Sequence, residues 1–366
     1  MKLRDLVNPH IRDLAPYVPG KPVEELEREL GISSAVKLAS NESPLGPSRR
    51  AVEAIFAAVE SLNRYPDDTC FVLRDRLATQ LGVAKDQLCF AGGSDGILEL
   101  LAKCFLAPGD EALFPWPSFA MYPIMTRGAG ATPVQVQLDR EFRADVSALL
   151  AAVTPRTRLL LLANPNNPTG TSIGAADFAR LVRELPERVV LAADEAYVEF
   201  VRRSDYPDSV RMLRERQTLV VLRTFSKSHA LAGLRIGYAI ADRELIEFLE
   251  RARHPFIVNS LAQVAAAAAL ADTAHTDRIR ELTHAGIAQL ETGLRQLGLS
   301  FANTDANFVL VEVGANADSL QEQLLRHGVI TRPLGGFGMK THLRVSVGTR
   351  EENERFLKAL ADELGR

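Results

Sequence analysis

Short apolar segments that alternate with helical stretches constrain the fold of this chain more than any other feature. The segments are rich in Leu, Val, Ile and Ala, and turns or helices separate them, as at 175–184. Continuous apolar strands are typical of a parallel sheet with both faces covered by helices. The strand candidates are 88–91, 112–114, 133–137, 158–163, 188–193, 219–223 and 236–240. The sequence therefore predicts an α/β fold with a mostly parallel sheet.

Polar or glycine-rich positions follow four of these strand candidates closely. They are the turn 92–96, Asn167, Asp194 and Lys227. In open parallel sheets, ligands bind beyond the carboxyl ends of the strands. We therefore expect these four features to line one site.

The turn 92–96, reading GGSDG, lies between the strand candidate 88–91 and a predicted helix over 97–105. Backbone N–H groups and the dipole at a helix N-terminus favour a bound anion. The turn lacks the GKS or GKT of a Walker loop and does not match GxGxxG. Many such turns bind nothing, so this feature alone does not define a site.

Lys227 stands just beyond a buried strand candidate, between Ser226 and, further along, Arg235. A lysine in such a turn is commonly an ordinary surface residue. Here a hydroxyl and a planar guanidinium, which suits a phosphate, accompany it. This combination suits a phosphorylated aldehyde held by the lysine as a Schiff base.

Size, charge and residue counts exclude several classes of protein. The chain has 366 residues, 46% of them hydrophobic, which is enough for a large core and two domains. A net charge of −3 gives no reason to expect nucleic acid or an anionic membrane. The alanine-rich run 261–270 is about half the length of a membrane span. The first residues lack the apolar core of a signal peptide, which favours a cytoplasmic protein.

Cysteine and histidine spacing predicts neither a disulfide framework nor a metal site. The three cysteines form no CxxC pair, and their number is odd. The seven histidines are scattered, with no HExxH or comparable ligand spacing.

The chain divides into three predicted parts: an N-terminal arm (1–35), a large domain (36–258) and a small α+β domain (259–366). In the small domain, strands at 308–313 and 343–347 alternate with helices at 319–327 and 351–363. The segment 37–47 contains too much Pro and Gly to be a helix or strand. It is either a linker or a loop across the mouth of a site.

An ordered set of motifs resembles the fold-type I pyridoxal-phosphate aminotransferases. These motifs are NPNNPTG at 164–170, DEAY at 194–197 and SK at 226–227 with Arg235. Four further motifs are similar to the histidinol-phosphate aminotransferase branch: YVPGKP at 17–22, LASNE at 38–42, AGLR at 232–235 and HLRVSVGT at 342–349. The resemblance spans nearly the whole chain and implies a seven-stranded large-domain sheet and a homodimer with its sites at the subunit boundary.

The resemblance also implies cofactor-binding roles. Lys227 is expected to join the aldehyde and to move a proton, and Asp194 to pair with the pyridine nitrogen. Tyr197 and Asn167 are expected to contact the phenolic oxygen, and Phe119 to stack on the ring. The residues expected at the phosphate are Gly93, Ser94, Asp95, Thr224, Ser226, Arg235 and, from the partner subunit, Tyr65. Plain packing is the alternative role for Tyr197 and Phe119.

Substrate roles implied by the resemblance fall on four further residues. Arg344 and Arg332 are expected to hold anionic groups, with surface salt bridges as the alternative. Tyr17 resembles a lid residue, and Asn41, Tyr65 and Asn167 are expected near the substrate. Two positions depart from the family pattern: Gly96 stands where relatives often have Glu, and Ile257 interrupts a familiar run.

The expected reaction is transamination of histidinol phosphate with 2-oxoglutarate, which gives imidazole-acetol phosphate and glutamate. Three alternatives stay open at this point. The first alternative is an aromatic-amino-acid aminotransferase, and the second is a decarboxylase of a phosphorylated amino acid that uses the same cofactor. The third is a non-catalytic binding protein with the same fold. The presence of Lys227 and the lack of a DNA-binding extension argue against the last.

Overall fold

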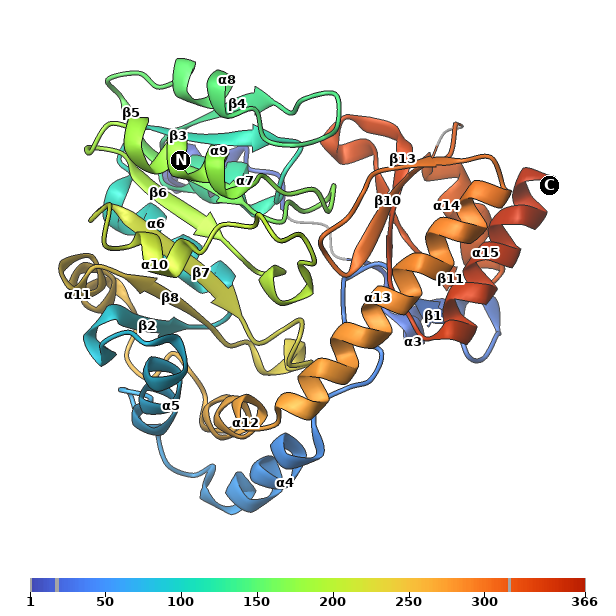
Figure 1. Cartoon of the computed structure of the whole chain (residues 1–366), viewed down its shortest axis with the longest axis horizontal. Helices are drawn as coiled ribbons and strands as arrows, with labels where there is room; N and C mark the ends of the chain where they lie inside the picture. Colours follow the sequence, from blue (N-terminus) through green and yellow to red (C-terminus); the bar gives the residue numbers. More distant parts are fainter. Residues whose placement is uncertain (1, 17–19, 315–316, 366) are drawn as a thin grey trace.

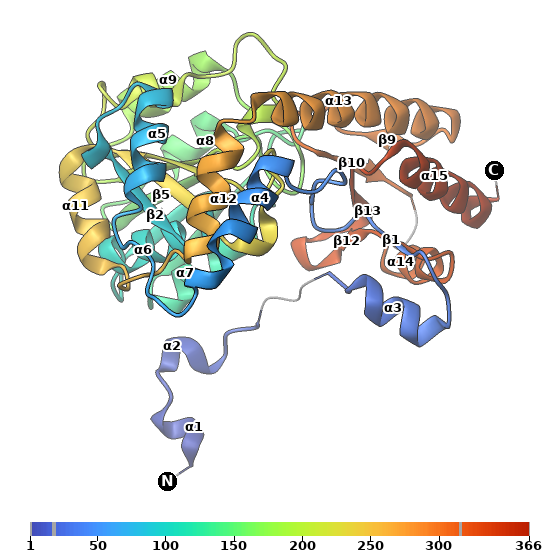
Figure 2. The ribbon, with the colours of Figure 1, turned by 90° about the horizontal axis from the view of Figure 1, so that it is seen from below.

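The computed structural model describes residues 2–16, 20–314 and 317–365. A large α/β part and a smaller α+β part lie side by side, and the long helix α13 (Thr273–Gln296) runs from one to the other (Figure 1). Short helices at the N-terminus extend away from the body (Figure 2).

The large part is built on a seven-stranded sheet with the order β2-β8-β7-β6-β5-β3-β4. Neighbouring strands from β7 to β4 are parallel, and β8 is antiparallel to both β2 and β7. The bounds are β2 Leu88–Ala91, β3 Glu111–Trp116, β4 Thr132–Gln137, β5 Thr157–Ala163, β6 Val190–Asp194, β7 Leu219–Thr224 and β8 Gly237–Ala241. The predicted mostly parallel sheet is confirmed.

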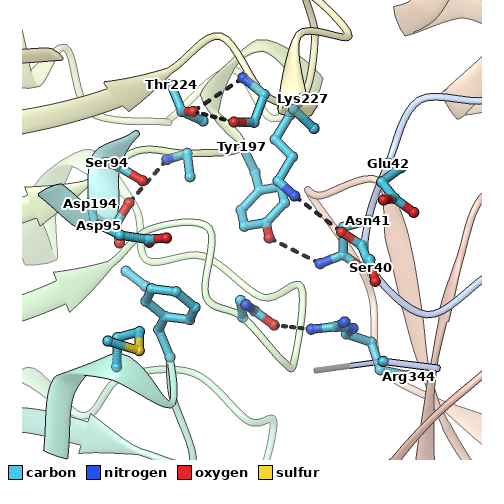
Figure 3. A pocket seen from close by; sticks show the side chains of 18 of the residues that line it. Ser40, Asn41, Glu42, Ser94, Asp95, Asp194, Tyr197, Thr224, Lys227 and Arg344 are labelled. Carbon is cyan, nitrogen blue, oxygen red and sulfur yellow. Dashed lines mark hydrogen bonds between the residues drawn. The ribbon is translucent and has the colours of Figure 1, made fainter. Parts of the chain in front are cut away.

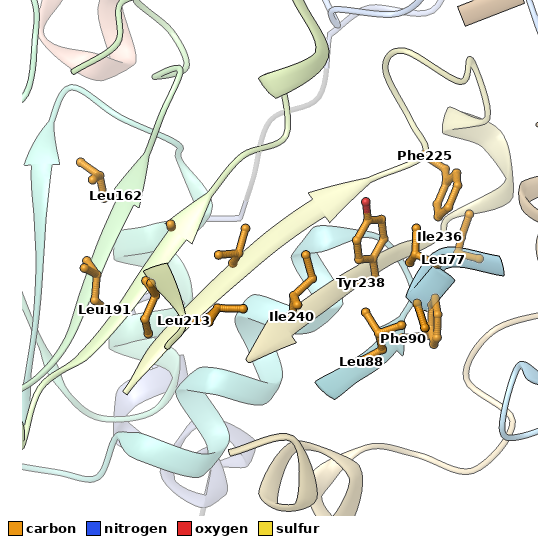
Figure 4. Packing of buried hydrophobic residues seen from close by; sticks show 14 of the residues in the cluster. Leu77, Leu88, Phe90, Leu162, Leu191, Leu213, Phe225, Ile236, Tyr238 and Ile240 are labelled. Atoms are coloured by element: carbon orange, nitrogen blue, oxygen red, sulfur yellow. The ribbon is translucent and has the colours of Figure 1, made fainter. Parts of the chain in front are cut away.

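Helices cover both faces of this sheet, which explains why its strands are apolar throughout. Successive side chains of a strand point to opposite faces. In β5, Leu160 and Leu162 belong to one buried cluster, and Leu159 and Leu161 to the cluster on the other face. Figure 4 shows the first cluster, in which Leu162, Leu191 and Ile240 lie on the same face of the sheet but on different strands.

Among the helices of the large part, the one predicted over 175–184 is confirmed as α9. Their bounds are α4 Arg49–Ala58, α5 Phe71–Leu81, α6 Ser94–Phe105, α7 Met121–Gly128, α8 Val146–Ala151, α9 Ala175–Glu184, α10 Ser209–Met212, α11 Arg243–Ala252 and α12 Ser260–Leu270. The start predicted for α6, residue 97, is wrong, because the helix begins at Ser94 directly after Gly93.

The small part has a four-stranded antiparallel sheet with the order β12-β13-β10-β9. Helices α13 and α15 (Arg350–Leu364) pack with it around a separate apolar cluster that includes Leu290, Val309 and Phe356. The other bounds are β9 Ser300–Phe301, β10 Phe308–Glu312, β12 Arg332–Leu334, β13 Met339–Ser346 and α14 Ala317–Arg326.

The packing at both predicted domain boundaries favours a different division of the chain. The predicted division itself stays a prediction. Strand β1 (Val36–Lys37) pairs in parallel with β11 (Val329–Ile330), so this segment belongs with the small part. Helix α3 (Val23–Leu30) buries Leu26 in the same cluster as Ile330. In contrast, α12 contributes Ala262 and Ala266 to the core of the large part. We propose that α12 belongs with the large part.

The first helices, α1 (Leu3–Leu6) and α2 (Pro9–Arg12), expose Leu3, Leu6 and Ile11. The predicted lid residue Tyr17 lies outside the described residues. Within the described ranges, no helix is both long and apolar enough to cross a membrane. The cytoplasmic location stays a prediction.

Candidate active site

A cavity of about 410 Å³ lies at the carboxyl ends of β5, β6 and β7, where the large part faces the small part. Its volume falls within the range of small-molecule sites. Backbone and side chains of 39–42 line it together with residues of β12 and β13. Figure 3 shows Lys227 and Tyr197 on one side of the cavity and Asn41 and Arg344 on the other.

Most of the residues predicted from the sequence line this cavity. They are Asn41, Ser94, Asp95, Phe119, Asn167, Asp194, Tyr197, Thr224, Ser226, Lys227, Arg235, Arg332 and Arg344. Gly93 caps α6 directly behind Ser94. Tyr65 is not in the cavity of its own chain, and 81% of its surface is exposed. The functional roles of these residues stay predictions.

One end of the cavity is suited to an anion. Helix α6 directs its free N-terminal N–H groups there, and Thr224 Oγ1 donates to Ser226 Oγ at 2.9 Å beside it. Arg235 Nη2 lies 3.2 Å from Asp95 Oδ2. Gly93 has φ +88°, and a Cβ there would lie 2.5 Å from Arg235 Nη2. Only glycine therefore permits both this turn and this approach of the arginine.

Asp194 ends β6 with its side chain buried in the floor of the cavity. Burial raises the pKa of this carboxyl to about 6, although Tyr122 donates a hydrogen bond to Oδ2 at 3.0 Å and opposes the shift. A buried carboxylate is stabilised by a cationic partner. Tyr122 was not predicted, although it lies three residues after Phe119 and its ring contacts Phe119 at 5.8 Å.

The raised pKa predicts how Asp194 changes the free energy of unfolding of the cofactor-free protein with pH. The folded state holds a proton that the unfolded state releases above about pH 4. The stabilising contribution of this bound proton to the free energy of unfolding is therefore complete below about pH 4, and it is lost as the pH rises through 6. Asp194→Asn, which cannot ionise, should be more stable than the wild type at pH 8 by up to about 3 kcal/mol. Urea unfolding at pH 4 and pH 8 measures this; an equal difference at both would contradict it.

Lys227 lies in the turn after β7, and its amine points across the cavity to the segment 39–42 (Figure 3). Nζ donates to the Ser40 carbonyl at 3.2 Å and lies 5.7 Å from the centre of the Tyr197 ring. Burial, with the nearby charge of Arg344, lowers the pKa of the amine to about 8. A substantial fraction of the amine is therefore neutral at slightly alkaline pH, as a nucleophile requires.

Polar contacts tie the two parts together around the lysine. Arg344 Nη1 donates to Asn167 Oδ1 at 2.6 Å, and Nη2 donates to the Ala39 carbonyl. Asn41 Nδ2 donates to the Tyr197 hydroxyl at 2.9 Å. The carbonyls of Ala39 and Ser40 were not predicted, because side-chain patterns say nothing of backbone oxygens. Residues 39–42 of the segment 37–47 thus form a loop at the site.

Arg332 and Arg344 are cross-strand partners in the small sheet and both line the cavity. Side chains directly opposite on an antiparallel pair project from the same face. Two guanidinium groups therefore face the cavity side by side. Together they are suited to bind a carboxylate or a phosphate.

The chain matches the sequence model of a known family, described as aminotransferase class I and II, over residues 33–360. It is 47% identical to histidinol-phosphate aminotransferase 2 of Pseudomonas aeruginosa over 361 residues, which cover 98% of each chain. The chain belongs to the class I and II aminotransferases. Histidinol-phosphate aminotransferase of Moorella thermoacetica is 45% identical and covers 97% of this chain, and the match covers 92% of that protein.

Solved structures of aminotransferases share the fold. Histidinol-phosphate aminotransferase of Sinorhizobium meliloti, solved in complex with pyridoxal-5'-phosphate, superposes with a TM-score of 0.90 at 28% identity, covering 97% of this chain and 96% of its own. Aspartate aminotransferase of Thermus thermophilus with maleate gives 0.85 at 25% identity, covering 97% and 99%. The predicted family, its histidinol-phosphate branch and the fold are confirmed.

Proposed function

We propose that this aminotransferase converts histidinol phosphate and 2-oxoglutarate to imidazole-acetol phosphate and glutamate. The observation that carries the proposal is the pair Arg332 and Arg344, whose guanidinium groups face the cavity together beside Lys227. Arg344 can hold the phosphate of one substrate and a carboxylate of the other in turn, and Arg332 would add a second positive charge for the phosphate alone. The names of the relatives at 44% to 47% identity support the same substrate.

We infer that the cofactor is pyridoxal phosphate, because the donor set fits it. The α6 N-terminus, Ser226 and Arg235 would hold the phosphate, and buried Asp194 would receive the pyridinium cation. Phe119 would pack against the ring, with Asn167 and Tyr197 at its phenolic oxygen. When bound, the cofactor supplies an aldehyde for the amino group and a ring that withdraws electrons from the substrate.

The protein's own residues would then move one proton and hold another. The neutral amine of Lys227 would take the proton from the substrate Cα and deliver it to C4′ of the cofactor, and in the second half of the reaction it would move a proton in the opposite direction. Asp194 would keep the proton on the ring nitrogen. Arg344 would orient the substrate so that the Cα–H bond faces Lys227, and the segment 39–42 would limit the access of water.

A panel of amino donors tests the proposed reaction. We expect kcat/KM for histidinol phosphate to exceed that for phenylalanine by about 10²-fold or more, since a site built for a charged group rejects analogues that lack it. Arg332→Gln should lower kcat/KM for histidinol phosphate by about 10²-fold and change that for phenylalanine little. A higher value for phenylalanine or tyrosine would indicate an aromatic aminotransferase instead. Release of carbon dioxide without consumption of 2-oxoglutarate would indicate a decarboxylase.

We also propose a homodimer in which Tyr65 reaches the cofactor phosphate of the partner subunit. The supporting observation is a run of exposed apolar side chains over α4, the following turn and α5: Phe56, Val59, Leu62, Phe71 and Val72. Tyr65 lies beside this run, and its ring stacks on Phe256 at 4.7 Å. Exposed apolar surface of this kind marks interaction sites.

The dimer predicts the effect of a charge on this surface. Phe56→Asp combined with Val72→Asp should convert the protein to monomers in sedimentation velocity, because two carboxylates would be buried without partners. The control is Leu30→Asp, at an exposed apolar position on α3. A double variant that sediments like the wild type would contradict this interface.

A further inference from the structure

Asn166 is a buried residue between two loops that carry side chains of the active site. It lies in the loop after β5, directly before Asn167, and only 3% of its surface is exposed. The loop after β3 carries Phe119, and Phe119 and Asn167 both line the cavity. Asn166 itself has no part in the chemistry proposed above.

The side chain of Asn166 uses both ends of its amide to join the two loops. Its Oδ1 accepts from Ser118 Oγ at 2.7 Å, and its Nδ2 donates to the Pro117 carbonyl at 3.0 Å. Nδ2 also donates to Thr169 Oγ1 at 2.9 Å, within the loop after β5. Because a carbonyl oxygen can only accept, the nitrogen of the amide must face Pro117 and the oxygen must face Ser118. The hydrogen bonds therefore allow the amide one orientation.

The hydroxyl groups beyond Asn166 continue the network in a single direction. Thr171 Oγ1 donates to the Phe142 carbonyl at 2.5 Å, and it lies 2.8 Å from Thr169 Oγ1. Since Thr171 gives its one hydrogen to the carbonyl, Thr169 must donate to Thr171 and accept from Asn166. Ser118, Thr169 and Thr171 are buried, as Asn166 is. The loss of the amide would therefore leave buried polar groups without partners, which is costly.

The backbone of Asn166 closes the turn that presents Asn167. Its N–H group donates to the Thr171 carbonyl at 2.8 Å, and its carbonyl accepts from the Gly170 N–H group at 2.7 Å. This turn is thus held as one unit, which the Asn166 amide joins to the loop after β3. The positions of Phe119 and Asn167 relative to each other therefore depend on this amide. A displacement of about 1 Å in such a position can cost about 10²-fold in rate.

We propose that Asn166 is a positioning residue that sets the Phe119 ring and the Asn167 amide relative to each other, through its hydrogen bonds to Pro117 and Ser118. The inference rests on the roles proposed for Phe119 and Asn167 at the cofactor. It has three consequences. The nitrogen of the amide is required as well as its shape, the loss of Ser118 acts through the same contact, and the loop after β3 moves even when no cofactor is bound.

The one tryptophan of the sequence reports the position of the loop after β3 without cofactor or substrate. Trp116 directly precedes Pro117, and its indole stacks on Phe337 of the small part at 5.7 Å. In the cofactor-free protein, Asn166→Ala should move the tryptophan emission to longer wavelength and raise its quenching by acrylamide about 2-fold. Ser118→Ala should change both in the same direction but by less, because the bond to the Pro117 carbonyl remains.

Asn353→Ala is the matched control, because it removes a buried amide of the small part. Asn353 Nδ2 donates to Gln289 Oε1 at 3.0 Å, and its Oδ1 accepts from the Gly348 N–H group at 3.0 Å. We expect this variant, like Asn166→Ala, to unfold at a lower urea concentration than the wild type. Its tryptophan emission and quenching should stay those of the wild type. The comparison separates a displaced loop from a general loss of stability.

Two measurements on the cofactor-loaded protein test the consequence for the site. Asn166→Ala and Asn166→Asp should each raise the Kd of pyridoxal phosphate and lower kcat by about 10-fold or more. The aspartate variant keeps the shape of the side chain, but it sets an oxygen against the Pro117 carbonyl, so it should be no faster than the alanine variant. The double variant Ser118→Ala/Asn166→Ala should be no slower than Asn166→Ala, because both changes act through one contact.

Four results would overturn the proposal. They are unchanged tryptophan emission and quenching in Asn166→Ala, equal changes in Asn353→Ala, an aspartate variant as fast as the wild type, and losses that multiply in the double variant. A wild type that does not bind pyridoxal phosphate would contradict the proposed function instead, and the tryptophan measurements would still test the contact between the loops. If Asn166→Ala does not fold, Ser118→Ala decides the matter, because its quenching must rise and that of Asn353→Ala must not.

Discussion

Replacing Lys227 with alanine is expected to lower kcat by at least about 10³-fold, the largest effect of any single change in this chain. The amine is the group that we propose attacks the aldehyde, and its burial keeps much of it neutral at slightly alkaline pH. No other lysine lines the cavity among the residues that the structure describes. Steady-state transamination, together with the visible absorbance of the cofactor, measures both the lost rate and the lost covalent attachment.

Lys103→Ala is a matched control for this variant. Lys103 lies on α6, and its amine caps the Ala252 carbonyl away from the cavity. Its loss should leave kcat unchanged. A Lys227→Ala protein that retains more than a tenth of the wild-type rate would show that another group performs the proton transfer.

Arg344→Ala is expected to have the second largest effect, a loss of about 10²- to 10³-fold in kcat/KM for both substrates. Its guanidinium is nearly buried, bonds Asn167 and the Ala39 carbonyl, and faces the cavity from the small part. A substrate carboxylate or phosphate would therefore lose a charge-assisted, partly desolvated contact. Initial rates with histidinol phosphate and 2-oxoglutarate varied separately measure the two losses.

Arg332→Gln provides the comparison for Arg344→Ala. The two arginines are cross-strand partners, but Arg332 is the one proposed to read only the phosphate. Its variant should therefore leave KM for 2-oxoglutarate little changed, whereas Arg344→Ala raises it. Equal effects of the two variants on both substrates would remove the proposed division of roles.

The sequence predicts the large sheet and its polar edge because both depend on local patterns. Buried strands read as apolar runs, and a polar residue at or shortly after the end of such a run indicates a site, as Asp194 and Lys227 do here. Helix α6 begins at Ser94, three residues before its predicted start, because a glycine-rich run reads as a turn. In the structure Gly93, with its positive φ, caps the helix.

Contacts between distant segments lie beyond such patterns. Strand β1 has two residues and pairs with β11 near the other end of the chain, which no periodicity indicates. The Ser40 carbonyl that accepts the hydrogen bond of the Lys227 amine is a backbone group, which no side-chain pattern indicates. Of the unpredicted neighbours, Tyr122 alone carried a local signal, its position three residues after Phe119.

The proposed mechanism requires the amine of Lys227 to hold the cofactor opposite the carboxyl of Asp194. Borohydride reduction of the cofactor-loaded enzyme, followed by peptide mass spectrometry, tests this directly. We expect a reduced phosphopyridoxyl group on the peptide that contains Lys227 and on no other lysine peptide. A label on a different lysine, or tightly bound cofactor that leaves Lys227 unmodified, would contradict it.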